Sequence, residues 1–206
     1  DEWELLQPAK PYDQFEPEEI VQRIKDAGIV GLGGAMFPTS VKLSPPKEKK
    51  IDLLVINGAE CEPYLTIDYR YMLERSEGLV RGVLAIMRAL KVKDAIIGIE
   101  DNKPKAIERM KEATKSTSIQ VKTLKTKYPQ GAEKQLIYAL TKRKVPSGGL
   151  PLDVGVVVDN IGTAYAIYEA VELGHPLVER GVTITGEGIR KPLNVVSRIG
   201  VMAEEL

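Results

Sequence analysis

The spacing of hydrophobic positions changes repeatedly along the chain, and these changes predict alternating strands and helices. Four short runs rich in Val and Ile predict buried strands, at residues 51–57, 95–100, 119–124 and 154–159. Longer runs with apolar residues three or four positions apart predict helices over residues 76–90, 104–115, 132–142 and 163–173. This alternation is typical of an α/β fold, with a mostly parallel, Rossmann-like sheet and helices on both faces.

The two ends of the chain depart from this alternation. Residues 1–16 have little periodicity and predict an extended lead-in, followed by a helix from Pro17 to Gly28. The last part predicts a strand at 182–185, a turn-rich connection at 186–194 and an apolar run at 195–201. We therefore expect three parts: an N-terminal extension with the first helix (1–28), an α/β domain (29–178) and the truncated start of a β-rich unit (179–206).

Composition and charge narrow the class of protein. Hydrophobic residues make up 43% and charged residues 28%, as in ordinary globular domains. The 29 basic residues balance the 29 acidic ones, so no overall field favours nucleic acid. Cys61 is the single cysteine, which excludes an intrachain disulfide and a cysteine-held metal or iron–sulfur site within this chain. No secretory signal and no apolar stretch of about 20 residues is present, so we expect membrane association only through a partner.

The loop at residues 31–38, Gly-Leu-Gly-Gly-Ala-Met-Phe-Pro, is the first candidate site. Its three glycines allow the backbone N–H groups to approach an anion closely. Met36 stands where a dinucleotide-binding fingerprint has its third glycine, and no Gly-Lys-Ser/Thr follows as in a P-loop. Lys42 could add a positive charge. Spacing alone leaves two alternatives open, a phosphate cradle and a plain flexible loop.

Three further polar clusters follow predicted strands, at residues 57–64, 128–133 and 159–163. Ligands of parallel α/β sheets bind at the carboxyl ends of the strands, which favours a binding role for these clusters. The alternatives are structural: Asn57-Gly58 favours a turn, and Asn160 or Thr163 suits the N-cap of a helix. That same helix start would also attract an anion.

Five stretches carry a resemblance to a known family: residues 28–43, 56–68, 96–104, 125–140 and 145–166. Together they resemble the C subunit of the Rnf electron-transport complex, and the sequence YPQGAEKQLI at 128–137 is the most specific of them. More distantly, the chain is similar to the NADH-binding flavoprotein subunit of respiratory complex I, which shares the GxGGxxFP loop.

The resemblance implies a flavoprotein subunit of a membrane-bound, ion-translocating ferredoxin:NAD⁺ oxidoreductase. FMN would be the cofactor, NADH the hydride donor or acceptor, and ferredoxin an indirect partner. Other Rnf subunits would hold the chain at the cytoplasmic side of the bacterial inner membrane. The family carries two [4Fe–4S] clusters beyond a β-grasp-like (SLBB) unit that residues 179–206 would begin, so electrons would pass to clusters outside this chain. A cobalamin-reducing flavoprotein and a non-catalytic docking module remain alternatives.

The resemblance also assigns roles to residues, although it implies no catalytic residue and no metal ligand, because the cofactor carries the chemistry. In the complex I subunit, acidic residues stand where this chain has Ala59 and Ala132. The FMN site would comprise Gly31, Gly33 and Gly34 along the flavin, Lys42 near its polar edge, Asn57 and Glu60 on the ribityl and ring region, Gly131 close to the flavin, and Asn160 and Thr163 at the phosphate. Weaker assignments to the NADH side are Phe37, Glu62, Tyr128 and Glu133.

Overall fold

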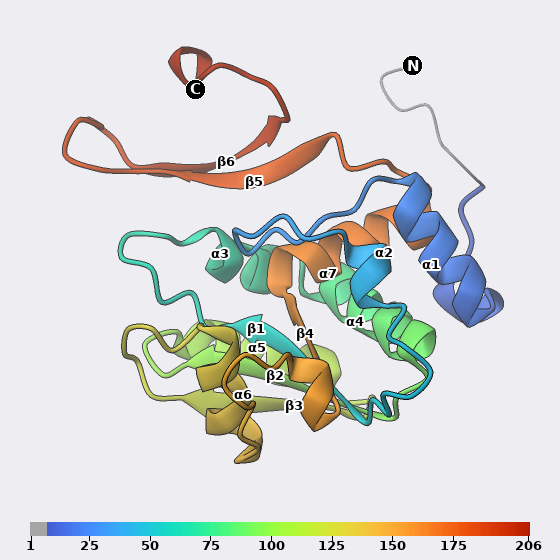
Figure 1. Cartoon of the computed structure of the whole chain (residues 1–206). Helices are drawn as coiled ribbons and strands as arrows, with labels where there is room; N and C mark the ends of the chain where they lie inside the picture. Colours follow the sequence, from blue (N-terminus) through green and yellow to red (C-terminus); the bar gives the residue numbers. More distant parts are fainter. Residues whose placement is uncertain (1–7) are drawn as a thin grey trace.

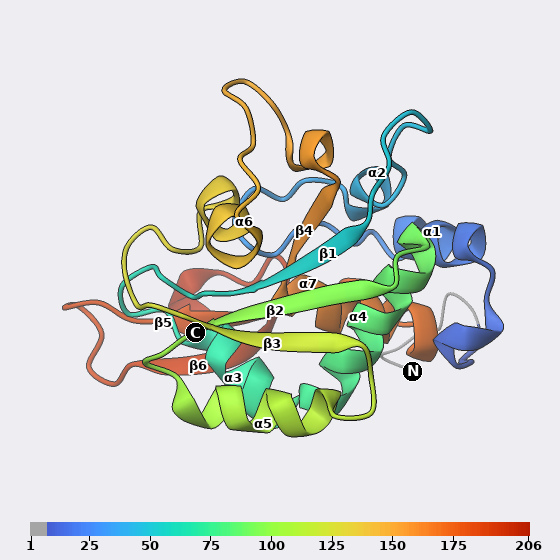
Figure 2. The ribbon, with the colours of Figure 1, turned by 90° about the horizontal axis from the view of Figure 1, so that it is seen from below.

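A four-stranded parallel sheet forms the centre of the structure, a computed structural model that describes residues 8–206. Figure 2 shows its strands side by side in the order β3-β2-β1-β4. They are β1 (Leu53–Gly58), β2 (Asp94–Glu100), β3 (Ile119–Leu124) and β4 (Val156–Asn160). The predicted α/β fold with a parallel sheet is therefore confirmed.

Seven α-helices precede or connect the strands in the described part of the chain (Figure 1). They are α1 (Pro17–Asp26), α2 (Thr39–Lys42), α3 (Ile67–Glu74), α4 (Ser76–Leu90), α5 (Pro104–Thr114), α6 (Glu133–Thr141) and α7 (Ile161–Tyr168). A π-helical turn, Glu169–Leu173, extends α7, and short 3-10 turns lie at Tyr12–Gln14, Pro151–Val154 and Ala203–Glu205.

Helices cover both faces of the sheet, as the sequence predicts, but unequally. Leu54 and Ile56 of β1 point into a large core shared with α1, α4, α5 and α7. Leu53 and Val55 point to the opposite face, where α6 packs on the strands and contributes Leu136, Ile137 and Leu140 to a smaller core. This alternation along one strand is the period-2 pattern of a sheet buried on both sides.

Two helices of the larger layer approach unusually closely. A Cβ atom on Gly82 of α4 would lie 1.8 Å from the carbonyl oxygen of Ala164 in α7, so only glycine allows this contact. Gly78, one turn earlier, leaves room in the same way for the ring of Tyr168. Glycine in mid-helix costs conformational entropy, and here close packing of α4 on α7 offsets that cost.

The sequence prediction was incomplete in two places. One helical turn, α2, follows the glycine-rich loop at Thr39–Lys42, where the sequence predicted no helix. Helix α3 was not predicted at all, since its hydrophobic positions do not form a clear stripe. By contrast, α1 begins at Pro17, as predicted, and its apolar residues Ile20 and Ile24 are fully buried.

An antiparallel hairpin follows the α/β layers. Strands β5 (Glu179–Ile184) and β6 (Leu193–Arg198) form a separate two-stranded sheet that lies beyond α3 and α7, at the top of Figure 1. The N–H of Gly181 donates to the Tyr71 hydroxyl at 3.0 Å, which pins β5 to α3. The domain boundary near residue 178 and the β-grasp-like identity of this unit stay predictions.

The order of the strands fixes where a ligand can bind. From β1 the chain proceeds through β2 to β3 on one side, and then returns to place β4 on the other side of β1. The crevice between two such neighbours, at their carboxyl ends, is the usual ligand site of open α/β sheets. Asn57 and Asn160 are paired across this point, near the ends of β1 and β4.

None of the helices in the described residues is long and apolar enough to cross a membrane.

Candidate functional site

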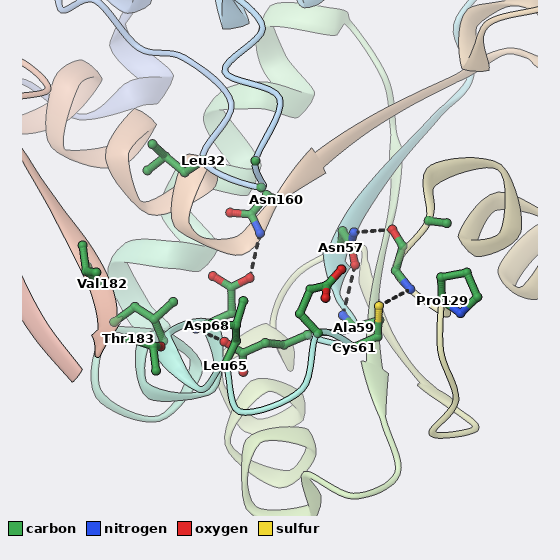
Figure 3. A pocket seen from close by; sticks show the side chains of 18 of the residues that line it. Leu32, Asn57, Ala59, Cys61, Leu65, Asp68, Pro129, Asn160, Val182 and Thr183 are labelled. Atoms are coloured by element: carbon green, nitrogen blue, oxygen red, sulfur yellow. Dashed lines mark hydrogen bonds between the residues drawn. The ribbon is translucent and has the colours of Figure 1, made fainter. Parts of the chain in front are cut away.

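A cleft of about 800 Å³ opens at the carboxyl ends of β1 and β4, and a smaller cavity of about 270 Å³ adjoins it. Gly33, Asn57, Gly131 and Asn160 line both cavities, so the two are parts of one site. In Figure 3, Asn57, Cys61 and Pro129 lie toward one end of the larger cleft, and Leu32, Asp68 and Thr183 toward the other. A volume of this size suits a cofactor or substrate of several rings.

The glycine-rich loop forms one wall of the cleft. It folds back on itself, with the N–H of Gly31 donating to the carbonyl of Phe37 at 2.9 Å. The N–H of Leu32 donates to the Thr163 hydroxyl at 2.9 Å, which anchors the loop on α7. A Cβ on Gly33 would lie 3.3 Å from the Cβ of Asn160. A side chain at this position would therefore press on the strand end beneath the loop.

Asn57 and Gly131 build the opposite wall. The side-chain amide of Asn57 donates to the carbonyl of Gly131 at 2.9 Å, and its oxygen accepts from the N–H of Ala59. The N–H of Gly131 donates to Cys61 Sγ at 3.2 Å. A Cβ on Gly131 would lie 2.5 Å from the Ala59 carbonyl oxygen, so the two loops meet only because this residue is glycine.

Three side chains form a hydrogen-bonded group across the floor of the cleft. Glu60 accepts from the backbone N–H of Asp68 at 2.8 Å and from that of Tyr69 at 3.3 Å, so it caps the start of α3. The amide of Asn160 donates to Asp68 at 2.7 Å. Burial raises the pKa of Glu60, and burial followed by repulsion from Glu60 raises the pKa of Asp68 to about 7. Asp68 is therefore close to half-protonated near neutral pH.

Asn160 acts as the N-cap of α7 in the described structure. Its side-chain oxygen accepts from the N–H groups of Gly162 at 2.8 Å and Thr163 at 3.3 Å. Thr163 is fully buried and bonded to the glycine-rich loop, and it is not among the residues that line either cavity. The structural alternative for this cluster is thus present, and the two N–H groups that a phosphate could use already have a partner.

Lys42 reaches the smaller cavity from α2. Its ammonium donates to the carbonyl of Val158 at 2.9 Å, at the end of β4. The neighbouring Asp159 is buried, and its Oδ2 has no hydrogen-bond partner in the described structure. Burial raises the pKa of Asp159 to about 6, with the charge of Lys42 opposing the shift. The smaller cavity therefore contains an ammonium group beside a carboxyl group with unused acceptor capacity.

The four residues assigned to the NADH side divide between the cavities. Glu62 and Tyr128 line the larger cleft, while Phe37 and Glu133 line the smaller one. Tyr128 is 65% exposed and Phe37 is 48% exposed, so both rings present apolar surface to solvent at the mouths of the site. Of the remaining predicted residues, Gly34 lines the larger cleft and Gly31 the smaller.

Sequence reasoning missed part of the site. Asp68 lies in the unpredicted helix α3, and Arg180 reaches the cleft from β5 together with the next three residues of that strand. Only the position of Asp68 at the end of a motif hinted at its role, and no spacing rule connects Arg180 with residues 31–38.

The carboxyl end of β2 does not reach the cleft, because Glu100 is buried and its carboxylate pairs with Lys103 at 3.3 Å. No group of three metal-ligating side chains occurs in the described part of the chain.

Comparison with known proteins identifies a family. The profile of the family described as "Nuo51 FMN-binding domain" matches residues 24–169. A similar solved structure is that of an NAD⁺-reducing [NiFe]-hydrogenase in the air-oxidised state, with a TM-score of 0.73 and 24% identity. The match covers 94% of this chain and 38% of the hydrogenase chain, and it supports the fold.

Three curated relatives are named as C subunits of ion-translocating complexes. The C subunit of the proton-translocating ferredoxin:NAD(+) oxidoreductase complex of Clostridium ljungdahlii is 57% identical over 97% of this chain and 44% of its own length. The Na(+)-translocating counterpart of Acetobacterium woodii is 50% identical over 93% of this chain and 44% of its own length. The C subunit of the ion-translocating oxidoreductase complex of Vibrio cholerae is 43% identical over the whole of this chain and 26% of its own length. The chain thus spans less than half of the length of these relatives, and the resemblance stated from the motifs is confirmed.

Proposed function

This chain belongs to the Nuo51 FMN-binding domain family, and from that premise we propose that it is the FMN- and NADH-binding part of the C subunit in an Rnf-type ferredoxin:NAD⁺ oxidoreductase. The observation that carries the proposal is the glycine-lined cleft at the carboxyl ends of β1 and β4. The names of the three relatives support the wider complex. Electrons would leave the chain for iron–sulfur clusters located elsewhere, because Cys61 is its single cysteine.

The residues at the cleft fit a flavin nucleotide. Two glycines leave room that a Cβ would take: Gly33 against Asn160, and Gly131 against the Ala59 carbonyl. The buried Asp159 Oδ2 has an unused acceptor site beside the smaller cavity, where a donor group of a ligand could bind. Aliphatic and aromatic groups, backbone amides and a few charged side chains alternate around the cleft, as in sites for a ring system with a polar tail.

Bound FMN would supply the hydride-exchanging ring for NADH and the link between two-electron and one-electron transfer. The chain itself binds and orients. Gly31, Gly33 and Gly34 would let the loop backbone lie against the cofactor, with Asn57, Glu60 and Gly131 on the opposite wall. The exposed rings of Phe37 and Tyr128 would pack against NADH, and Glu62 and Glu133 would accept hydrogen bonds from it.

The carboxyl groups of the cleft give it a further property. Burial, and after it repulsion from Glu60, raises the pKa of Asp68 to about 7, so the negative charge of the cleft changes with pH near neutrality. NAD⁺ and NADH differ by one positive charge on the nicotinamide ring. A less negative cleft would therefore weaken the binding of NAD⁺ more than that of NADH.

We assign the chain to the cytoplasmic side of the bacterial inner membrane, held there by other Rnf subunits, with ferredoxin as an indirect partner. The names of the relatives, which are subunits of proton- or Na(+)-translocating complexes, support the association with a membrane complex.

Anaerobic reduction of the FMN-loaded chain by NADH tests the proposal. Loss of flavin absorbance on addition of NADH, but not of an equal amount of NAD⁺, is the expected result. Asn57→Ala should slow this reduction, while Asn102→Ala, an exposed change at the end of β2 outside both cavities, should not. A loaded chain whose flavin is not reduced by NADH would contradict the NADH part of the proposal, and a chain that binds no FMN would favour a docking module.

A further inference from the structure

Arg180 is the one lysine or arginine among the described residues that line the larger cleft. It belongs to β5 in the C-terminal hairpin and is far in sequence from the rest of the site. One guanidinium nitrogen, Nη2, donates to the carbonyl of Leu32 in the glycine-rich loop at 3.3 Å. Its Nε is buried and has no hydrogen-bond partner in the described structure. A guanidinium group is always charged and has five N–H donors, so most of its capacity for hydrogen bonds is unused.

The surroundings of Arg180 hold it in place. The Thr183 hydroxyl accepts from the N–H of Thr66, and the Tyr71 hydroxyl accepts from the N–H of Gly181. A Cβ on Gly181 would lie 2.6 Å from the side chain of Ile67, so β5 packs tightly on α3 beside the arginine. The guanidinium group is itself bonded to the Leu32 carbonyl and its Nε is buried, so an anion would meet a side chain that the protein already positions, which lowers the entropic cost of binding.

The charges near Arg180 leave it without a full counter-ion. No ion pair of Arg180 within 4.0 Å occurs in the described residues. Its charge lowers the pKa of Asp68, but burial has the larger effect and holds that pKa near 7. Asp68 also accepts from Asn160 at 2.7 Å. A partly protonated carboxyl group does not neutralise the guanidinium, whose field therefore reaches the cleft.

The alternative source of charge for an anion is weaker. Asn160 already occupies the N–H groups of Gly162 and Thr163 at the start of α7. Lys42 lies in the adjoining cavity and donates to a backbone carbonyl. A phosphate near Leu32 and Asn160 would thus find its strongest partner in a guanidinium group, which suits phosphate oxygens geometrically.

We infer that Arg180 binds the phosphate group of the flavin nucleotide, so that the hairpin unit completes the cofactor site of the α/β domain. This inference rests on the proposed function and extends it to a residue outside the matched region 24–169. It makes the position of the hairpin and the occupancy of the cleft depend on each other, because the same side chain contacts the loop carbonyl of Leu32 and the ligand.

Comparison of FMN with riboflavin, which lacks the phosphate, tests the inference without relying on activity. Equilibrium binding of each flavin is measured by fluorescence quenching, with wild type, Arg180→Gln, Arg180→Lys and the control Arg190→Gln. Arg190 is exposed in the connection between β5 and β6 and lines neither cavity of the site, so its replacement removes the same charge away from the cleft.

We expect Arg180→Gln to weaken FMN binding on the order of 10- to 100-fold and to leave riboflavin affinity within about twofold, as for loss of a hydrogen bond between charged groups. Arg180→Lys should recover part of the affinity for FMN. Raising the salt concentration should reduce the preference of the wild type for FMN over riboflavin. Thermal unfolding of each variant checks that it is folded. The salt dependence is measured on the wild type, so this part of the test holds even if a variant does not fold.

Equal weakening of FMN and riboflavin in Arg180→Gln would overturn the inference, since the arginine would then act only through Leu32. Unchanged FMN affinity in this variant, or a wild type that binds both flavins equally, would also overturn it while leaving flavin binding intact. A wild type that binds neither flavin would instead contradict the proposed function, and the inference with it.

Discussion

Replacing Gly131 by alanine is the sharpest test of the close approach between the two loops that form one wall of the cleft. The added Cβ would lie 2.5 Å from the carbonyl oxygen of Ala59 and 3.2 Å from Cys61 Sγ. The nearer atom belongs to the backbone, so relief requires a loop to move by roughly 0.9 Å to reach an ordinary contact. That movement would lengthen the hydrogen bonds from Asn57 to the Gly131 carbonyl and from the Gly131 N–H to Cys61.

The expected cost follows from the overpacking of a tight contact. Such insertions destabilise a protein by about 1–3 kcal/mol, which lowers the midpoint of thermal unfolding by roughly 2–12 °C in a chain of this size. The displaced wall should also weaken FMN binding by about tenfold or more, for which a loss of about 1.4 kcal/mol is sufficient.

Gly188→Ala is the matched control, because nothing lies within 4 Å of the Cβ position there and its φ is not in the left-handed region. Thermal melts and flavin titrations of both variants form the assay. If Gly131→Ala unfolds and binds FMN like Gly188→Ala, the two loops do not approach each other as closely as described, and the reasoning fails.

Three further changes probe the fold and its charges by chemical or thermal unfolding. Asn160→Ala should lose about 1 kcal/mol of stability through the missing helix cap. Asn160→Asp keeps the cap acceptor but places a second carboxylate against Asp68, so its loss of stability should grow from about pH 5 to about pH 8. A loss of stability that does not depend on pH would refute this. Gly82→Ala should cost about 3 kcal/mol or more, since its Cβ would lie 1.8 Å from the Ala164 carbonyl; a neutral result would exclude the close packing of α4 on α7. Burial raises the pKa of Glu169 from 4.5 to about 7. Its contribution to stability is therefore full below the unfolded-state pKa and is lost as pH rises through the folded-state pKa. Glu169→Gln should flatten this decline in the free energy of unfolding by at most about 1.4 kcal/mol per pH unit, and an unchanged slope would contradict the reasoning.

The strands and long helices could be predicted because local pattern and tertiary burial agree in them. Helix α4 spans Ser76–Leu90, the predicted residues, since its apolar positions recur at helical spacing and face one core. Helix α3 was missed because its residues, Ile67–Glu74, are held by contacts made elsewhere: Glu60 caps its start, and β5 packs on its side. Local sequence does not encode either contact.

The candidate site likewise contains residues that could be predicted from the sequence and residues that could not. Strand ends could be predicted, and with them the clusters at Asn57, Gly131 and Asn160, because parallel strands align their carboxyl ends at one edge of a sheet. The strand order β3-β2-β1-β4 could not be deduced from spacing, and therefore neither could the position of the end of β2, where Glu100 lies outside the cleft. Arg180 could not be foreseen, because its place depends on how the hairpin packs on α3.

Equilibrium titration of the purified chain with FMN tests the central claim most directly. The chain should bind FMN with a dissociation constant in the micromolar range or below, quench the flavin fluorescence and shift the visible absorption bands. Substitution of Gly33 by a bulky residue should abolish this binding without unfolding the protein, because the side chain would fill the cleft beside Asn160. Absence of flavin binding by the folded wild type at micromolar concentrations, or undiminished binding by the Gly33 variant, would contradict the account.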